Sequence, residues 1–220
     1  MQLRTMLPVI LWSIFPPLLK GARGAFFYRG LPSILLSCLL LLITHSALAQ
    51  EKIQVVTKTI QKQIPWKATQ KIVFNAEKAN ISVQGWDQDE LKVTIKLISK
   101  HPQRTVAEQD LSILQYAIKL EEGQLELTNF FRIQEGSPKI HSNLQAVYEV
   151  TIPQSSQLFI KNRYGNISLA DWQGNASITA SFGEVQLDNT QGEMLLNIDY
   201  GDILITQVDA DITANTKKTN

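Results

Sequence analysis

The sequence predicts an all-β protein whose C-terminal part is a parallel β-solenoid with 18-residue, two-strand coils, preceded by an irregular β-rich segment. The first observation behind this prediction is a glycine, or its smallest substitute alanine, at every ninth position of the last quarter of the chain: Gly165, Gly174, Gly183, Gly192, Gly201 and Ala210. The second is that two apolar residues, two positions apart, follow each of them, as Ile203 and Ile205 follow Gly201. The third is the alternation of apolar and polar residues in the segment before the repeats. Repeats of this kind are stronger evidence for the architecture than local secondary-structure patterns are.

Residues 1–49 are expected to form an N-terminal extension and signal peptide. Leu31 to Ile43 is an apolar run with Arg23 and Arg29 upstream, and Ala47-Leu48-Ala49 provides the small residues of a cleavage site. The run is shorter than the roughly 20 residues that span a membrane. We therefore expect cleavage after Ala49 and export to the periplasm, the outer surface or the medium. The alternative is anchoring by an uncleaved hydrophobic segment.

Composition limits the chemistry of the exported part. The single cysteine of the 220-residue chain is Cys38, inside the apolar run, so the exported part has neither disulfide nor thiolate chemistry. Four of the 21 basic residues and none of the 20 acidic ones precede Glu51, which leaves seventeen basic residues against twenty acidic ones and a net charge of −3. This charge argues against nucleic-acid binding.

Residues 50–154 are predicted to be the β-rich first part of the domain. Alternating or β-branched segments favour strands, and they lie at Ile53–Ile60, Lys71–Ala76, Ala79–Val83, Leu91–Ser99, Gln124–Phe130 and Ala146–Ile152. Thr105 to Gln115 suits a helix that begins with a capping box formed by Thr105 and Glu108, although Ile113 and Tyr116 suit a strand equally well. No linker rich in glycine, proline or serine precedes residues 155–220, so one continuous body is expected.

Residues 155–220 are predicted to hold the repeats, each of them one strand and one turn. Apolar residues two apart share one face of a strand, and glycine beside an acidic or amide residue suits a turn with positive φ. The turns alternate in type, because an aromatic residue precedes every second glycine and a polar residue precedes the others. The true period is therefore eighteen residues, with the strands of successive repeats stacked in parallel about 4.8 Å apart.

The aromatic residues of these turns form the most tempting candidate site: Tyr164, Phe182 and Tyr200. Stacked and exposed, they would be a ladder for sugar rings. Period-two counting instead places them on the inward face, so we interpret them as a structural stack at the corner, with the tyrosine hydroxyls reaching solvent. A ligand-facing ladder is the alternative.

Acidic residues follow the glycines in two columns, one with Glu184 and Asp202 and the other with Glu193 and Asp211. We interpret them as solvated turn residues. A calcium-binding parallel β-roll also has eighteen-residue coils, but it needs several glycines in each unit, whereas each unit here keeps one. Close carboxylates repel one another, so weak stabilisation by divalent ions is a testable alternative.

The sequence predicts neither catalysis nor a cofactor or metal. His101 and His141 stand in polar segments without a nucleophile or paired ligand nearby in sequence. Phosphate-binding glycine loops, zinc patterns and nucleophile elbows are missing from the sequence. The expected class is a non-enzymatic protein.

Several motifs carry a resemblance to a known family. They are the segments Asn80–Asp87, Tyr148–Pro153 and Tyr164–Ile167, the last with echoes at Phe182–Val185 and Tyr200–Ile203. With these, the region from Ile72 to Ala214 resembles the adhesin-like domain of unknown function that is common in exported bacterial proteins. The resemblance implies a β-solenoid on or outside the cell envelope, and it brings no catalytic residues with it.

The functional hypothesis is an exported adhesin or cell-envelope interaction module whose partner is a cell surface, a glycan or an envelope protein. The alternative is a structural or signalling accessory that docks on a membrane partner through its more basic N-terminal half.

Overall fold

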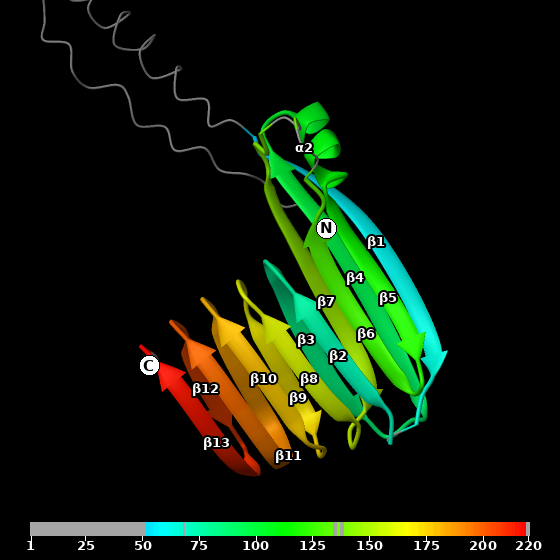
Figure 1. The fold of residues 1–220 in the computed structure, drawn as a ribbon, viewed down its shortest axis with the longest axis vertical. Helices are drawn as coiled ribbons and strands as arrows, with labels where there is room; N and C mark the ends of the chain where they lie inside the picture. The colour runs from blue at the N-terminus through cyan, green and yellow to red at the C-terminus, as the bar shows by residue number, and fades with distance from the viewer. Residues whose placement is uncertain (1–51, 68, 134–135, 137–138, 219–220) are drawn as a thin grey trace, which may run out of the picture. The chain divides into compact units, whose positions relative to one another are not determined.

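The computed structural model describes residues 52–67, 69–133, 136 and 139–218, all of which belong to one compact unit, Glu51–Asn220. These residues form thirteen strands and one helix (Figure 1). The elements are β1 Gln54–Pro65, β2 Lys71–Ala76, β3 Ala79–Trp86, β4 Glu90–His101, α2 Arg104–Leu111, β5 Leu114–Glu121, β6 Gln124–Phe131, β7 Asn143–Pro153, β8 Gln157–Asn162, β9 Ile167–Trp172, β10 Ala176–Ser181, β11 Glu184–Asp199, β12 Asp202–Thr206 and β13 Asp209–Lys217.

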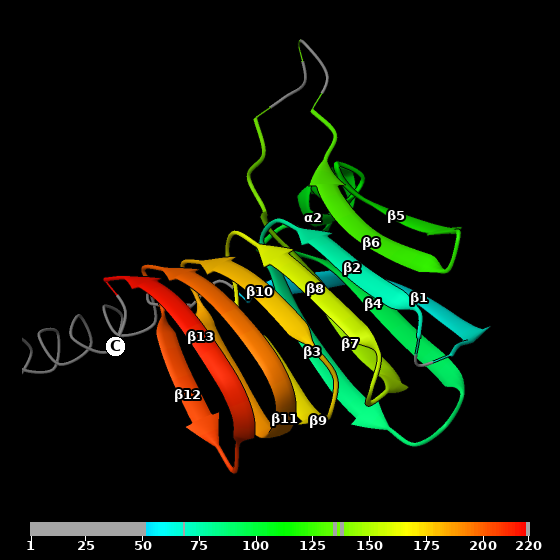
Figure 2. The same ribbon diagram turned by 60° about the horizontal axis from the view of Figure 1, so that its bottom comes forward.

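The predicted fold class, a parallel β-solenoid, is wrong, because the structure is all-β with one mixed, curled sheet. Eleven strands follow one path through this sheet in the order β1-β4-β7-β3-β9-β11-β10-β8-β2-β6-β5, and β12 and β13 both pair with β11. The pairs β1/β4, β4/β7 and β5/β6 are antiparallel, and the remaining pairs are parallel. The sheet curls so that its two halves face one another (Figure 2).

The eighteen-residue period does set the pairing of the C-terminal strands. Val185 of β11 pairs in parallel with Ile203 of β12 and with Ile167 of β9, each eighteen residues away. Met194 of the same strand pairs with Ala176 of β10 and Ile212 of β13 at the same offset. The expected turn at Gly192 lies inside β11, where Gly192 has a φ of 98° and the strand passes from pairing with β12 to pairing with β13. β11 runs from Glu184 to Asp199 and so belongs to both halves of the curled sheet.

The core lies between the two halves of the sheet. Strands show the alternation of buried and accessible residues that the sequence predicts, for example in β2 and β8. The rings of Phe74 in β2 and Tyr148 in β7 meet edge to face with centroids 5.7 Å apart. Burial raises the pKa of Tyr148, whose hydroxyl donates to Oδ1 of Asn129 over 3.3 Å. One hydrophobic cluster draws on residues both before and after position 155.

The segment between β4 and β5 contains the helix that the sequence left in competition with a strand. α2 covers Arg104–Leu111, and β5 begins at Leu114. The expected capping box is not formed, because Gln103 occupies the N-cap position and makes no side-chain cap hydrogen bond. The Arg104 guanidinium instead donates to the Glu108 carboxylate over 2.8 Å, one turn along the helix.

The expected signal peptide and its cleavage after Ala49 lie outside the described residues. Among the residues that the structure describes, none of the helices is both long and apolar enough to cross a membrane.

Candidate binding surface

Three aromatic side chains stack at successive turns along one side of the domain. Tyr164 lies between β8 and β9, Phe182 between β10 and β11, and Tyr200 between β11 and β12. The ring centroids are 5.2 Å apart for Tyr164 and Phe182 and 5.1 Å apart for Phe182 and Tyr200, with interplanar angles of 19° and 6°. We call these three residues the aromatic ladder. The eighteen-residue register of the adjacent strands places them one above another.

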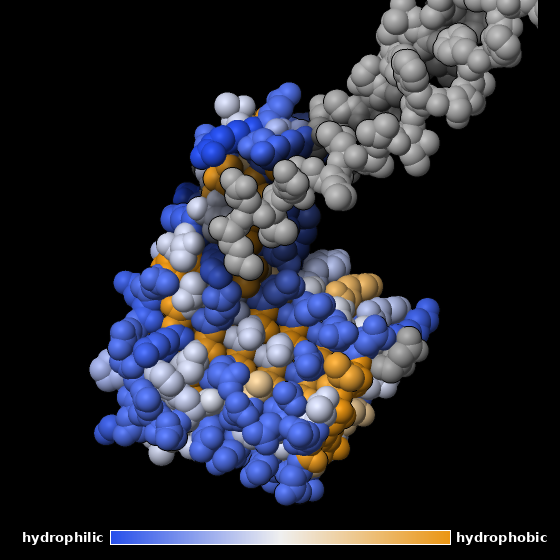
Figure 3. Space-filling view, turned by 180° about the vertical axis from the view of Figure 1, so that it is seen from behind, coloured by the Kyte–Doolittle hydropathy of each residue, from blue (hydrophilic) through white to orange (hydrophobic). Residues whose placement is uncertain are grey.

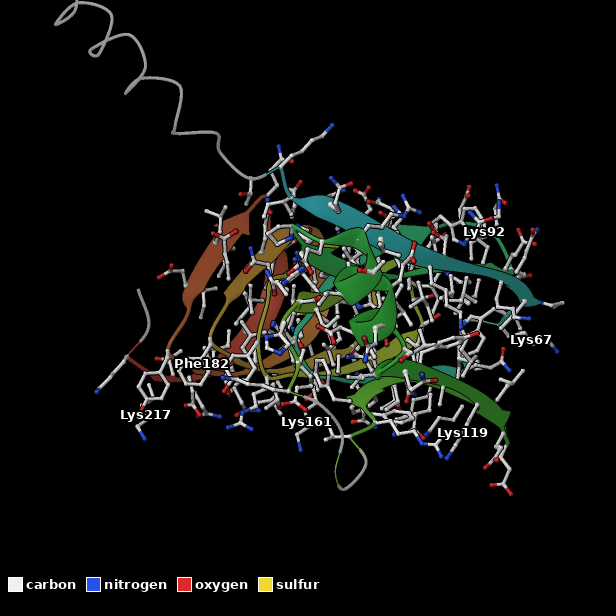
Figure 4. The ribbon with its side chains drawn as sticks, turned by 90° about the horizontal axis from the view of Figure 1, so that it is seen from above. Lys67, Lys92, Lys119, Lys161, Phe182 and Lys217 are labelled. Atoms are coloured by element: carbon white, nitrogen blue, oxygen red, sulfur yellow. The ribbon has the colours of Figure 1, made fainter. Side chains whose placement is uncertain are left out.

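The aromatic ladder points to solvent, so the predicted inward position is wrong. The exposed fraction is 37% for Tyr164, 46% for Phe182 and 40% for Tyr200. Period-two counting failed because Phe182 and Tyr200 each have a φ of 56°, in the left-handed region, which ends the alternation of the preceding strand. Figure 4 shows Phe182 on one side of the domain, pointing away from the strands.

The glycines that follow Phe182 and Tyr200 serve another purpose than the predicted positive φ, whereas Gly165, which follows Tyr164, has a φ of 113° as predicted. A Cβ on Gly183 would lie 2.2 Å from the carbonyl oxygen of Gly165, and one on Gly201 would lie 2.1 Å from that of Gly183. Neither Gly183 nor Gly201 has a positive φ. These glycines are needed because the backbones of successive turns touch, while the left-handed conformation falls on the aromatic residues.

Cations cover the two ends of the aromatic ladder. The Arg163 guanidinium lies 5.2 Å from the ring centroid of Tyr164, and the ammonium groups of Lys217 and Lys218 lie 5.7 Å and 5.4 Å from that of Tyr200. Figure 4 shows Lys217 beside Phe182 on the same side of the domain. Because the inner ring faces stack on one another, the aromatic ladder presents ring edges, hydroxyl groups and these cations to a ligand.

One buried and one exposed amide side chain hold the first turn of the aromatic ladder in place. The amide Nδ2 of Asn162, a residue only 2% exposed, donates to the carbonyl oxygens of Ala79 at 2.8 Å and Gly165 at 3.2 Å. Beside it, the side chain of Asn166 accepts a hydrogen bond of 3.1 Å from the backbone N–H of Glu184. Tyr164 is therefore carried by a turn that is tied to the sheet on two sides.

The structure brings one of the two acidic columns to the aromatic ladder. Glu184 and Asp202 directly follow the glycines of the ladder turns and pair in register across β11 and β12. Glu193 and Asp211 pair across β11 and β13, away from the ladder turns. Among the described residues, His, Cys, Asp and Glu side chains form no group of three that could hold a metal ion.

A shallow depression on the outer face of the sheet was missed by the sequence analysis. It has a volume of about 550 Å³ and lies over β8, β10, β11 and β13, with Glu193 and Asp211 in its lining. Phe159 and Leu195, both exposed, stand on either side of the small residue Ser177. The sequence could have indicated this outer face, because Phe159 and Leu195 occupy outward positions of strands that lie on either side of β10. The ammonium of Lys71 lies 4.2 Å from the ring centroid of Phe159 and covers one face of this ring.

His141, one of the two histidines considered above, belongs to a structural contact. Its backbone N–H and that of Ser142 donate to the carboxylate of Asp110 at 2.9 Å and 2.7 Å. Burial by itself would raise the pKa of Asp110, but the hydrogen bonds from Ser142 and His141 and the nearby His141 ring outweigh it, so that this pKa lies below its ordinary value of 3.8. The contact joins α2 to the start of β7.

Comparisons with known proteins give distant structural likenesses. No protein-family model matches the sequence, and no curated protein matches it. A solved structure described as a candidate cell adhesion protein from Clostridium sporogenes has a TM-score of 0.37 at 11% identity and covers 75% of this chain and 100% of its own. A candidate adhesin from Parabacteroides merdae has a TM-score of 0.24 at 9% identity, with 74% and 95% covered.

A third solved structure, described as a candidate lipid binding protein from Parabacteroides distasonis, has a TM-score of 0.25 at 11% identity, again with 74% and 95% covered. With TM-scores below 0.5, these likenesses establish neither the family nor the function of this chain.

Proposed function

We propose that this chain is an exported, non-enzymatic binding module with an adhesin-like function, and that the aromatic ladder is its contact surface. The observation that carries the proposal is that Phe182 and Tyr200 hold large, exposed rings on left-handed backbone. A bulky residue in this conformation costs about 1 to 3 kcal/mol, and such strain clusters at binding sites. Asparagine or glycine would make the same turn at lower cost.

Stacking alone offsets this strain only in part. An aromatic pair contributes about 0.5 to 1.5 kcal/mol beyond the burial of its area, and Tyr200 stacks on one ring only, that of Phe182. At Tyr200 the stabilising free energy of ring stacking and the destabilising free energy of the strained backbone are therefore of similar size. A role in ligand contact accounts for keeping a ring there.

The chemistry around the aromatic ladder favours a glycan chain as the ligand. Hydroxyl-rich ligands need both acceptors and donors, and the ladder is flanked by the carboxylates of Glu184 and Asp202 and by cations at both ends. Ring edges offer apolar contact to the C–H groups of a sugar. The three rings of the aromatic ladder are evenly spaced, which fits a ligand built of repeating units, such as a surface polysaccharide.

The Tyr200→Asn variant tests the proposal. Purified residues 50–220 are compared with this variant for binding to a glycan panel, whole cells and envelope fractions, alongside thermal unfolding. We expect binding to fall at least about tenfold, which corresponds to 1.4 kcal/mol. The free energy of unfolding should change by less than about 1 kcal/mol, because lost stacking and relieved backbone strain nearly cancel.

The matched control is Phe130→Asn, which removes an equally exposed ring, 42% accessible, from β6 and away from the aromatic ladder. It should leave binding unchanged. A Tyr200→Asn variant that unfolds more easily but binds normally would show that the ladder is a structural stack and would refute the proposed contact surface. A broad panel without any binding would refute the adhesin-like function itself.

Export is part of the proposal and rests on the apolar run and the small residues at Ala47 to Ala49. Mass spectrometry of the mature N-terminus from the native cell envelope tests it. A chain beginning at Gln50 supports cleavage, whereas an intact N-terminus would contradict it and favour the anchored alternative.

A second function, docking on a membrane partner, is favoured by a row of lysines on β4. Lys92, Lys96 and Lys100 are four residues apart and so share one face of the strand. Lys96 is paired with Glu149 at 2.5 Å, and Lys92 lies 3.5 Å from Glu90. A crosslinking pulldown from native membranes that returns one stoichiometric partner would favour this function over general adhesion.

A further inference from the structure

The C-terminal strands leave one end of the curled sheet open. Among the described residues, β12 and β13 each pair with β11 alone, so the outer edge of each strand presents unpaired backbone N–H and C=O groups. An exposed strand edge is a ready template for pairing with another strand. This end consists of two such edges side by side, one from each half of the sheet.

The apolar columns of the core reach solvent at this end. Leu169 and Leu187 are fully buried, whereas Ile205, the next residue of the same column, is 48% exposed. Leu204 on the opposite face of β12 is also 48% exposed. Figure 3 shows apolar surface gathered at the end of the domain where β12 and β13 lie. Apolar surface that adjoins a strand edge marks an interaction site.

The sequence of β13 is complementary to itself when it runs antiparallel. Asp209 begins the strand and Lys217 ends it, and both side chains are exposed. If two copies of β13 pair with Thr213 opposite Thr213, Asp209 of each copy faces Lys217 of the other. Opposite charges directly across an antiparallel pair stabilise it. The same register places Ile212 opposite Ala214, so apolar residues continue to meet on the inner face.

The neighbouring strand β12 fits the same arrangement. Pairing around Leu204 would place Ile203 of one copy opposite Ile205 of the other and Asp202 opposite Thr206. A two-fold axis perpendicular to both halves of the sheet, which passes between each strand and its copy beside Leu204 and Thr213, sets each edge against its own copy, and this is the isologous geometry of a C2 dimer. Both halves of the curled sheet would then continue across the interface, and the exposed ends of the apolar columns would cover one another.

We propose that the open edge formed by β12 and β13 binds a second copy of this chain in an antiparallel, edge-to-edge dimer. The partner is identified by the self-complementary charges of β13 and by the apolar columns that end at this edge. The three rings of the aromatic ladder lie outside this interface, but Lys217 also covers the ring of Tyr200 and so belongs to both surfaces. The Thr213→Cys test below leaves Lys217 unchanged and therefore separates the dimer from the ligand proposed above.

Charge reversal tests the proposed register. Residues 51–220, which form a compact unit with their own core, are studied by analytical ultracentrifugation over a range of concentrations. Lys217→Asp sets like charges opposite one another at two symmetric places, and we expect it to weaken dimerisation about tenfold. The double variant Asp209→Lys/Lys217→Asp restores opposite charges across the interface and should return the dimer to near its original affinity.

Disulfide trapping tests the same register by geometry. The chain from residue 51 onward contains no cysteine. Residues opposite one another in an antiparallel pair have Cβ atoms about 4.5 to 5.5 Å apart, within reach of a disulfide after a small adjustment. Thr213→Cys should therefore form a covalent dimer under mild oxidation. Ser177→Cys, on β10 and two strands inside the edge, is the control and should remain uncrosslinked.

A monomer at every concentration would overturn the proposal. Dimerisation that is unchanged in Lys217→Asp would also overturn it, and so would a double variant that dimerises no better than the single one. Either result would indicate nonspecific association of the apolar end, which has no preferred register. Equal crosslinking at positions 177 and 213 would have the same meaning.

Discussion

At the residue scale, two neighbouring residues share the steric demands of the turns at Phe182 and Tyr200. Phe182 takes the left-handed backbone conformation, with φ of 56°. Gly183, next to it, provides the space into which the carbonyl oxygen of Gly165 projects. The sequence shows the aromatic–glycine pair but assigns the unusual φ to the wrong member, because glycine is the usual residue at positive φ. This error hid the outward position of the rings.

A pair of identical substitutions separates these two uses of glycine. Gly183→Asn adds a Cβ within 2.2 Å of backbone, whereas Gly123→Asn adds one at a φ of 77° with its nearest neighbours 3.9 Å away. Asparagine tolerates left-handed backbone but cannot remove a clash. We expect Gly183→Asn to lower the free energy of unfolding by about 1 to 3 kcal/mol or more, as overpacking does.

Gly123→Asn should change the free energy of unfolding by less than about 1 kcal/mol. Chemical denaturation of both variants measures the difference. Equal losses in the two variants would mean that the turn at Gly183 rearranges, and that close backbone contact is not what requires glycine there.

At the element scale, α2 is joined to the sheet by one buried carboxylate. Asp110 is 3% exposed and accepts hydrogen bonds from two backbone N–H groups at the start of β7. Its pKa lies below the ordinary value of 3.8. The charged form therefore stabilises the folded state in full above pH 3.8, and that contribution is lost as the pH falls through the folded-state pKa.

Replacing Asp110 by asparagine should remove this acid sensitivity. We expect Asp110→Asn to lower the free energy of unfolding by about 1 to 3 kcal/mol at neutral pH, because a charged acceptor of two buried donors is lost. Below pH 3.8 the wild type should approach the variant. Denaturation curves across this range measure the effect. Glu108→Gln on the same helix, where the carboxylate is 50% exposed, is the control and should follow the wild type.

At the scale of the whole molecule, the sequence predicted the strands better than their arrangement. The six predicted strands before residue 155 correspond to β1, β2, β3, β4, β6 and β7. β2 has the predicted bounds, and the other five extend past at least one predicted end. The mixed sheet was missed because alternation with period two is the same in parallel and antiparallel pairs. β1 and β4 carry no repeat that would fix their direction, and they pair antiparallel over their full lengths.

The candidate site was predicted in part, for a similar reason. Periodicity brought Tyr164, Phe182 and Tyr200 together, because parallel strands at a fixed offset stack equivalent residues. It could not show that the rings point outward or that Arg163 and Lys218 cover the ends, since both depend on the backbone conformation of single residues. The depression beside Phe159 is lined by equivalent positions of successive repeats, among them Ser177 and Leu195. The repeat places these residues on one outer face, but it does not show that this face is hollowed.

Gly183 and Gly201 each lie against the carbonyl eighteen residues before them, so the length of this region can change only in fixed steps. Removing residues 183–200 joins Phe182 to Gly201 and sets Gly201 beside the carbonyl of Gly165, as Gly183 is now. Such a deletion should retain one cooperative unfolding transition. Removing only residues 183–191 joins Phe182 to Gly192 and sends the following strand to the opposite half of the sheet, which should abolish cooperative folding of this region. Natural length variants of the domain are therefore expected to differ by whole multiples of eighteen residues.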